Sequence, residues 1–280
     1  MANPVVSAPL AALQLRFAII DLSGEIRVVD QEQIQRLLSG TELGDPSFYK
    51  RADAELLMRR TIEALPYQCK PRQVLDEFWT SPATIAYKAT AFTPEPTPAS
   101  TLNFWVGPSP HAKAGNWVLL RNFLRDIICA GDCSTFDYLI GFMAHMIQKP
   151  EEKPGVMVTL LGGQGTGKGV YFSLLRAIWP RTTLLASNIE QITGRFNACL
   201  ERNFIICMDE ALFAGDRRAM DSLKSIITES MLQIEQKFQP TRTIQSVHRL
   251  FASSNHSHFG NIELDDRRFV FLSVSGNKRQ

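Results

Sequence analysis

The pattern of apolar and polar positions changes character near residue 156. From there onward, short apolar runs alternate with a glycine loop and helical segments. This alternation predicts an α/β fold, in which a parallel sheet carries helices on its faces. The near-continuous hydrophobicity of the runs is typical of strands covered on both sides. We expect these strands at Val156–Leu161, Thr183–Leu185, Phe204–Met208, Leu250–Ser253 and Phe269–Val274.

The first hundred residues show a mixed pattern. Leu15–Ile20 and Glu25–Val29 flank a Ser-Gly pair and predict a β-hairpin. Ala54–Leu65 and Arg72–Trp79 carry apolar residues at helical spacing. Ala91–Ser100 holds three prolines in a polar setting, which is typical of an extended linker. We therefore predict a small α+β domain over residues 1–100, a helical lead-in over 101–154 and an α/β core over 155–280.

Further elements surround the core strands in the sequence. A short strand around Leu102–Val106 and two helices, Trp117–Ile128 and Thr135–Gln148, precede them. Between the third and fourth core strands we expect a helix at Ala219–Glu229 and then a hairpin with its turn near Lys237–Thr241. The motifs with candidate chemistry all fall at the ends of core elements.

Composition says little about partners. Of 280 residues, 45% are hydrophobic and 21% are charged, which allows a substantial core and argues against wholesale disorder. The formal net charge is only +2. If the chain binds nucleic acid, its basic groups must be focused locally or gathered by oligomerisation.

We expect no targeting signal in the sequence. The N-terminal segment lacks a basic start and reaches Arg16 before any long apolar run, so we expect no signal peptide. The longest apolar stretch, Tyr138–Ile147, is about half a membrane span and predicts a core helix. The five cysteines show no zinc-site spacing. We expect a soluble, cytoplasmic protein with no membrane partner.

The first core strand runs directly into a glycine loop, and a helix follows at about Val170. The loop has the pattern G-x-x-x-x-G-K, in which glycines let successive N–H groups face phosphate oxygens. The helix N-terminus favours the same anion, and Lys168 can reach the β- and γ-phosphates. A glycine-rich turn without a ligand is the alternative, against which the strand and helix on either side argue. The residues expected to bind ATP are Gly162, Gly163, Gln164, Gly165, Thr166, Gly167, Lys168 and Gly169.

Gly169 departs from the usual pattern. A Ser or Thr commonly follows the lysine and supplies a hydroxyl to Mg²⁺. Two substitutes are open here: the hydroxyl of Thr166, or a water molecule at that position while Asp209 holds the ion.

Two adjacent acids end the third core strand. Ligands of open parallel sheets bind at the carboxyl ends of the strands, where Asp209 and Glu210 lie. We expect Asp209 to position Mg²⁺ and Glu210 to act as general base toward the attacking water. Paired acids on a surface loop are common by chance, so this assignment depends on the glycine loop in the same sheet.

Polar residues also lie at the last two core strands. Asn255 ends the fourth strand, where its amide can bind the γ-phosphate or the attacking water; a simple Asn turn is the alternative. Arg267 and Arg268 precede the fifth strand, and either can serve a neighbouring subunit as an arginine finger. Pairing with Asp265 or Asp266 is the alternative, and we expect it for one of the two arginines.

The predicted hairpin carries candidate DNA-binding residues. Lys237 and Phe238 lie close to its tip, and Arg242 opens its return strand. A cation beside an aromatic ring can hold a phosphate and stack on a base of single-stranded DNA. An ordinary hairpin with a solubilising lysine explains the same residues, and the residues alone do not decide between these interpretations.

Together the motifs resemble those of superfamily 3 helicases, particularly the phage and poxvirus primase–helicase branch. The matching segments are, in order, GGQGTGKG, IICMDE, the helix and hairpin from Lys224 to Lys237, LFASSN and DDRRF. They cover residues 156–274. The upstream LNFWVG segment and the two helices after it are similar to the lead-in of that branch, whereas residues 1–100 resemble it only loosely.

The resemblance implies a P-loop NTPase core of the AAA+-like kind, assembled as a ring, usually hexameric, around DNA. It implies Mg²⁺-dependent ATP hydrolysis between subunits, with Arg267 or Arg268 supplied in trans. Lys237 would track one strand of single-stranded or forked DNA through the pore, and Lys224 belongs to the same motif. The usual setting is replication of a phage or mobile element in a bacterial host cell, and an anti-phage role is the alternative.

Relatives of this kind often carry a primase upstream. No Asp-x-Asp pair and no zinc-binding cluster precedes residue 91, so we expect no primase there. A separate primase or another replication protein is open as a partner. The sequence ends at Gln280, soon after the last strand, which leaves little room for a C-terminal lid. A fragment of a longer primase–helicase and a stand-alone helicase piece are both open.

Two other function classes are open. A nucleotide-regulated DNA-binding or loading factor with little hydrolysis is suggested by Gly169 and by the expected lack of a C-terminal lid. A small-molecule kinase would use the same glycine loop, but it would need neither DDRRF nor a core strand ending at Asn255. ATP-driven DNA unwinding accounts for the most motifs.

Overall fold

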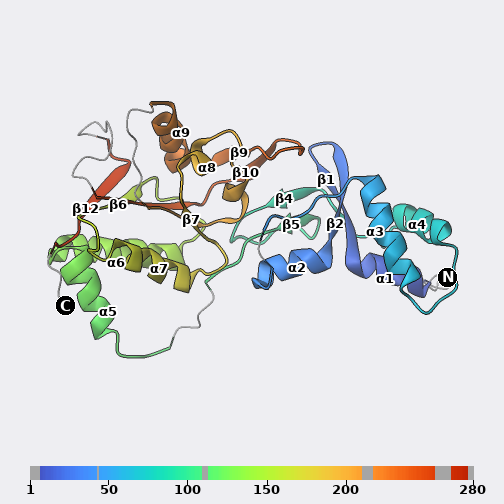
Figure 1. The fold of residues 1–280 in the computed structure, drawn as a ribbon, viewed down its shortest axis with the longest axis horizontal. Coiled ribbons are helices and arrows are strands. Elements are labelled where there is room, and N and C mark those ends of the chain that lie inside the picture. Colours follow the sequence, from blue (N-terminus) through green and yellow to red (C-terminus); the bar gives the residue numbers. More distant parts are fainter. Residues whose placement is uncertain (1–6, 43, 109–112, 210–216, 256–265, 277–280) are drawn as a thin grey trace. The chain divides into compact units, whose positions relative to one another are not determined.

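A computed structural model of the chain describes residues 7–42, 44–108, 113–209, 217–255 and 266–276 (Figure 1). The chain forms two compact units. The first consists of residues 1–91 and 96–104, and the second of residues 92–95 and 105–280. The chain therefore passes into the second unit at residues 92–95 and returns to the first unit for residues 96–104. It then enters the second unit again at residue 105.

A hairpin forms the main sheet of the first unit. β1 (Phe17–Leu22) pairs antiparallel with β2 (Glu25–Asp30), and β3 (Ala86–Tyr87) adds in parallel to β1. Ser23 and Gly24 have φ values of 55° and 89°. These left-handed conformations match the two-residue turn that closes a twisted hairpin. The predicted hairpin is confirmed, with its first strand beginning at Phe17 instead of Leu15.

The helices of the first unit enclose a small apolar core. Leu13, Met58 and Phe78 are fully buried in it. The two predicted helices are present, and two shorter ones that the sequence did not predict accompany them. The four are α1 (Ala8–Arg16), α2 (Gln31–Ser39), α3 (Arg51–Glu63) and α4 (Pro71–Thr80).

The proline-containing segment is not a free linker. It joins β4 (Ala89–Ala91) to β5 (Thr101–Asn103), which pair in parallel. Phe92 within it is fully buried and packs against Trp105 with the two rings tilted, their centroids 5.2 Å apart. The expectation of an extended linker over 91–100 was wrong here, because an aromatic side chain anchors the segment in the second unit.

Two helical segments lead into the core of the second unit. The helix predicted over 117–128 is α5 (Val118–Asn122), which continues as a π-helix, η1 (Phe123–Ile128). It is followed by α6 (Cys133–Gln148). Leu139 of α6 is fully buried, as expected for a core helix. Within the described residues, no helix is both long and apolar enough to cross a membrane.

The second unit is built on a five-stranded parallel sheet in the order β12-β6-β11-β8-β7. The predicted α/β fold with a parallel sheet is confirmed. β11 lies in the middle of the sheet, and all six of its residues are buried. The strands are β6 (Met157–Leu161), β7 (Thr183–Ala186), β8 (Ile205–Met208), β11 (Arg249–Ser254) and β12 (Phe269–Ser273).

Side chains alternate between the two faces of this sheet. Phe251 packs against Phe142 of α6 and Tyr171 of α7 (Lys168–Ile178), with ring centroids 5.7 and 5.8 Å apart. Leu250 and Ala252 face the opposite side, in a cluster with α9 (Arg217–Thr228). Figure 1 shows α6 and α7 on one side of the strands and α9 on the other.

A separate two-stranded hairpin follows α9. β9 (Met231–Ile234) pairs antiparallel with β10 (Arg242–Gln245), as predicted. Ile234 and Ile244 anchor the hairpin in the cluster under α9. Two short elements precede β8 in the chain, α8 (Glu190–Thr193) and the 3₁₀ helix η2 (Ala198–Arg202).

Candidate functional site: a glycine loop at the carboxyl edge of the sheet

The glycine loop leaves β6 beside the end of β11. The amide of Gly162 donates to the carbonyl of Ser254 at 3.2 Å. A Cβ atom at Gly162 would lie 3.0 Å from Cβ and 3.1 Å from the carbonyl oxygen of Val274, so a larger residue there would require Val274 to shift. Gly165 and Gly167 have φ values of 74° and 101°, which glycine adopts without strain. The glycines are thus required by the path of the loop.

The loop presents backbone donors that the protein itself does not use. Within the described part of the chain, the N–H groups of Gly163, Gln164 and Gly165 make no hydrogen bond to a protein acceptor. All three residues are exposed. Gly167 is the N-cap of α7, so the positive end of that helix lies at the same place. Exposed N–H groups at a helix N-terminus are suited to bind phosphate.

The side chain of Lys168 folds back onto the glycine loop. Its ammonium group donates to the carbonyls of Gly162 and Gly163, at 2.6 and 2.8 Å, and to Oδ1 of Asn255 at 2.8 Å. These contacts use the three donors of an ammonium group, and only 6% of Lys168 is exposed. The structure therefore brings together Lys168 and Asn255, which the sequence places far apart.

Strand alternation brings further polar groups to the same face. Cys207 of β8 and Phe251 of β11 lie on the α7 side of the sheet, so Asp209 and Ser253, two residues further along, also face that side. The hydroxyl of Ser253 donates to Oδ1 of Asp209. Ser253 is fully buried, whereas Asp209 is exposed. Sequence reasoning noted Asp209 but missed Ser253, whose role depends on strand register.

The donors present fit a magnesium ion bound together with a nucleotide. Mg²⁺ prefers oxygen ligands, and with nucleotides it takes one or two carboxylates plus phosphate oxygens. Asp209 supplies such a carboxylate. Among the described residues, no cluster of three or more His, Cys, Asp or Glu could hold a metal without a nucleotide. Gly169 offers no hydroxyl, and Glu210, the expected general base, lies outside the described residues.

The two arginines before β12 occupy different environments. Arg268 donates from Nε to Oδ1 of Asp266 at 2.8 Å, so one arginine is paired as expected. Arg267 is exposed and makes no ion pair within the described residues. Asp266 also binds Lys224 of α9, at 3.3 Å. This ion pair gives Lys224 a structural role in joining α9 to β12, which the expectation of DNA binding did not foresee.

An exposed group of aromatic and basic side chains lies at the tip of the β9–β10 hairpin. Phe238 is 93% exposed, with a φ of 64°, and Phe196 is 48% exposed. The ammonium of Lys237 lies 5.2 Å from the centre of the Phe196 ring, and the guanidinium of Arg195 lies 5.7 Å from it. Arg195 also pairs with Glu235 at 2.9 Å. Lys237 and Phe238 are placed as predicted.

The segment that carries Phe196 is fastened to the hairpin. Nδ2 of Asn197 donates to the carbonyl of Gln233 at 3.0 Å, and the amide of Glu235 donates to Oδ1 of Asn197 at 2.9 Å. We define Arg195, Phe196, Lys237 and Phe238 as the hairpin-tip cluster. Arg195 and Phe196 were not predicted, although an arginine beside an aromatic residue is the same signal as Lys237 beside Phe238.

Arg242 does not belong to this cluster, and its expected role in binding DNA needs correction. Its guanidinium donates to both carboxylate oxygens of Glu201, at 2.9 and 2.7 Å, and both side chains are almost fully buried. A bidentate pair of this kind leaves the guanidinium no surface for DNA. Arg242 therefore ties β10 to η2 and has a structural role.

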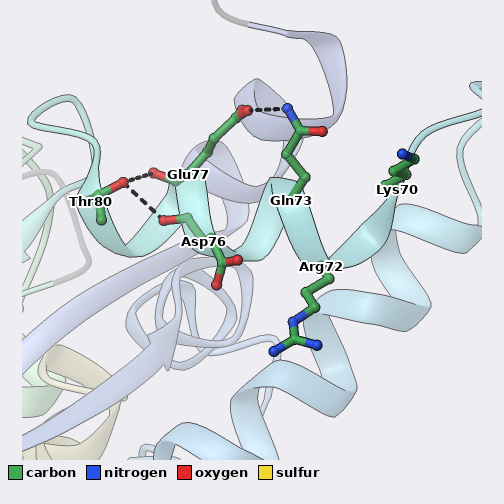
Figure 2. A pocket seen from close by; sticks show the side chains of 6 residues that line it. All are labelled: Lys70, Arg72, Gln73, Asp76, Glu77 and Thr80. Atoms are coloured by element: carbon green, nitrogen blue, oxygen red, sulfur yellow. Dashed lines mark hydrogen bonds between the residues drawn. The ribbon is translucent and has the colours of Figure 1, made fainter.

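A shallow hollow also lies on α4 of the first unit (Figure 2). Figure 2 shows that its polar groups bind one another along the helix: Gln73 donates to Glu77, and Thr80 donates to the carbonyls of Asp76 and Glu77. The hollow contains none of the predicted site residues. Nothing in it points to a ligand.

Part of the chain matches a described protein family. Residues 160–268 match the model of a family of unknown function, DUF5906. This range begins just before the glycine loop and ends at Arg268, so it includes Lys168, Asp209 and Asn255.

Among curated proteins, the chain is similar to a DNA primase-polymerase of Nitratiruptor phage NrS-1. The two are 29% identical over 162 residues, which are 56% of this chain and 22% of the phage protein. The chain thus corresponds to about a fifth of the length of that relative.

Solved structures of the NrS-1 C-terminal region share the fold. One apo structure has a TM-score of 0.65 at 19% identity and covers 95% of this chain and 62% of that one. Another, its A form, has a TM-score of 0.65 at 17% identity and covers 94% and 60%. At these identities, the likeness concerns the fold alone.

Proposed function

We propose that the second unit is the motor of an ATP-dependent DNA helicase of the superfamily 3 type, acting in replication of a phage or mobile element. One observation carries the proposal. A glycine loop with unused N–H donors, Lys168 bound to Asn255, and Asp209 held by Ser253 all meet at the carboxyl edge of one parallel sheet. This is the arrangement that binding and hydrolysis of a nucleoside triphosphate require.

In the proposed reaction, a water molecule attacks the γ-phosphorus of ATP. The bond from that phosphorus to the β–γ bridging oxygen breaks, so ADP and inorganic phosphate leave. The loop amides bind the phosphates, and Lys168 exchanges its contacts with the loop carbonyls for phosphate oxygens. Glu210 takes the proton of the water, and Asn255 positions that water or the γ-phosphate. A Mg²⁺ ion held by Asp209 would neutralise phosphate charge when bound.

Completion of the site by a neighbouring subunit is part of the proposal. Arg267 is exposed and unpaired within the described residues, whereas Arg268 is bound to Asp266. Arg267 is therefore the better candidate for a finger that reaches the nucleotide of the next subunit. A homo-hexameric ring would supply this contact at every site.

We assign contact with single-stranded DNA to the hairpin-tip cluster. Phe196 and Phe238 expose flat rings on which bases can stack, and Lys237 and Arg195 add positive charge beside them. Lys224 and Arg242 are left out, because both are engaged in ion pairs. The name of the NrS-1 relative, a DNA primase-polymerase, supports a role in phage DNA replication. A primase would then act as a partner of this motor.

Unwinding of a forked duplex tests the proposal. The wild-type chain should separate the strands with ATP and Mg²⁺, and should not do so with a non-hydrolysable ATP analogue. Glu210→Gln should retain ATP binding and lose unwinding, because the base is removed while the phosphate contacts remain. Unwinding that persists without hydrolysable ATP would contradict the proposal.

A nucleotide-regulated DNA-binding or loading factor is the second candidate. Gly169 favours it, because the residue offers no hydroxyl to a metal ion. Such a factor would bind ATP and DNA and hydrolyse little. DNA affinity that changes severalfold with bound ATP, without strand separation or turnover, would select this candidate over the motor.

A further inference from the structure

We infer that Ser253 positions Asp209 for metal binding and supplies from β11 the hydroxyl that the glycine loop lacks at Gly169. The inference rests on the proposed function, because it concerns the metal ion that accompanies the nucleotide. It assigns a role to a residue outside the expected site and explains how a loop with glycine at that position can work.

Strand register places the two groups side by side. Ala252 of β11 lies opposite Met208 of β8, so Ser253 comes opposite Asp209 at the point where β8 ends. The hydroxyl of Ser253 donates to Oδ1 of Asp209. Ser253 is fully buried whereas Asp209 is exposed, so the donor is held inside the sheet and the carboxylate reaches the surface. The carboxylate is thereby fixed in rotation, and Oδ2 remains as an acceptor for a metal ion or its bound water.

Other hydroxyl groups near the loop are used differently. Thr166 donates to the carbonyl of Gly163 at 2.9 Å, within the loop itself. Ser173 donates to the carbonyl of Gly169 at 2.9 Å, along α7. The hydroxyl bound to the proposed metal ligand is that of Ser253. This observation favours Ser253 over Thr166, one of the two substitutes that the sequence suggested.

Position 169 has room for the missing hydroxyl. A Cβ atom built on Gly169 meets no atom within 4 Å, and the residue is exposed. Gly169→Ser is therefore expected to fold normally. Combining it with Ser253→Ala allows a direct exchange. The Ser253→Ala substitution removes the hydroxyl from β11, and Gly169→Ser places a hydroxyl at the start of α7.

The test measures metal binding without turnover. Binding of Mn²⁺ to the full chain with a non-hydrolysable ATP analogue can be followed by the electron paramagnetic resonance signal of free Mn²⁺. Ser253→Ala should weaken Mn²⁺ binding roughly 10- to 100-fold, the usual effect of losing a group that orients a metal ligand. Gly169→Ser in the same chain should restore most of it. Gly169→Ser alone should change it less than about twofold, because the wild-type site already has its hydroxyl.

Thr159→Val is the matched control. Thr159 is a fully buried hydroxyl residue of the neighbouring strand β6, and it faces the α9 side of the sheet. The Thr159→Val variant should leave Mn²⁺ binding unchanged. A loss equal to that of Ser253→Ala would show a general effect of buried hydroxyls and overturn the inference.

The remaining outcomes separate this inference from the proposed function. If the folded Ser253→Ala variant binds Mn²⁺ normally, or if Gly169→Ser fails to restore binding, the inference is wrong and the motor proposal stands. If Gly169→Ser alone tightens binding tenfold or more, the wild-type site lacks its hydroxyl, and the inference is again wrong. If the wild-type chain binds no Mn²⁺ with the nucleotide, the proposed function fails and the inference fails with it.

Discussion

Polar residues lie at both ends of β11, and their surroundings differ. At its carboxyl end, Ser253 and Asn255 meet Asp209 and Lys168 at the proposed nucleotide site. At its amino end, Arg249 is fully buried and donates to three backbone carbonyls, those of Val247, Lys149 and Glu152. The carboxyl end lies at the proposed nucleotide site, whereas the amino end supplies hydrogen-bond donors to the backbone of neighbouring segments.

His248, next to Arg249, belongs to a chain of hydrogen bonds with one consistent direction. Lys153 donates to the carbonyls of Ile226 and Glu229 and to the hydroxyl of Ser246. Ser246 donates to Nδ1 of His248, and Nε2 of the ring donates to the carbonyl of Leu200 at 2.8 Å. This direction requires a neutral imidazole and a charged lysine.

The comparison shows that a buried cation is not a sign of function by itself. Arg249 and Lys168 are both buried basic residues with three acceptors. They differ in what surrounds them, since Lys168 lies among exposed loop amides whereas Arg249 lies inside the fold. Substitutions at the two ends should therefore separate loss of function from loss of stability.

The largest expected effect is on ATP hydrolysis in Lys168→Ala. We expect turnover to fall by at least roughly 10²- to 10³-fold, since a preorganised charge at the transferred phosphate is lost. Phosphate release under saturating ATP measures this change. The thermal midpoint of unfolding should fall much less than in Arg249→Met. Hydrolysis close to wild type would contradict the role of Lys168.

The next effect is on stability in Arg249→Met. Three carbonyls would lose their donor inside the protein, so we expect the free energy of unfolding to fall by about 3–5 kcal/mol. Denaturant titration measures it, with Arg176→Met on the exposed face of α7 as control. A change as small as that of the control would show that water or other donors replace the guanidinium.

Low pH should lower the free energy of unfolding through protonation of His248, at the amino end of β11. Burial lowers the pKa of His248 to about 4, helped by the positive charges of Lys153 and Arg249 and opposed by the bond to Leu200. Between pH 6.5 and 4, the unfolded chain binds a proton that the folded chain does not, so stability falls as pH falls. The full loss is about 3 kcal/mol. In His248→Gln, the free energy of unfolding should vary less over this range; an unchanged profile would rule out His248 as its source.

The smallest of these effects concerns DNA at the hairpin-tip cluster. Phe196→Ala should weaken binding of single-stranded DNA by about 1–3 kcal/mol, or roughly 5- to 150-fold, because a stacking surface is lost. Phe196→Tyr keeps the ring and should bind nearly as wild type. Fluorescence anisotropy of a labelled oligonucleotide measures both. ATP hydrolysis without DNA should be unchanged, and equal DNA affinity of the two variants would argue against stacking.

The sheet of the second unit could be predicted because its central strands, β6, β8 and β11, are buried on both sides. Their sequences are apolar almost throughout, and each is followed by polar residues. The same pattern located Asp209 and Asn255 at strand ends, and Lys168 at the start of the helix that follows the glycine loop. By contrast, the sequence reading missed α2, although Ile34, Leu37 and Leu38 stand at helical spacing and Asp30 caps the amides of Glu32 and Gln33.

The pairing of charged groups could not be predicted. Arg242 and Glu201 are 41 positions apart, and nothing local distinguishes this arginine from one exposed on a hairpin. The bond from Ser253 to Asp209 depends on the register between β11 and β8. Phe196 contacts Lys237 because Asn197 and Arg195 tie its segment to the β9–β10 hairpin. These contacts arise from tertiary packing, which the order of residues does not reveal.

The most direct test of the proposed motor is stimulation of ATP hydrolysis by single-stranded DNA. Phosphate release should be measured for the wild-type chain with and without an oligonucleotide, beside Lys168→Ala. The proposal predicts turnover that rises severalfold with DNA and disappears in the variant. Turnover that does not respond to DNA, or that persists in Lys168→Ala, would contradict the assignment of a DNA-driven motor to this glycine loop.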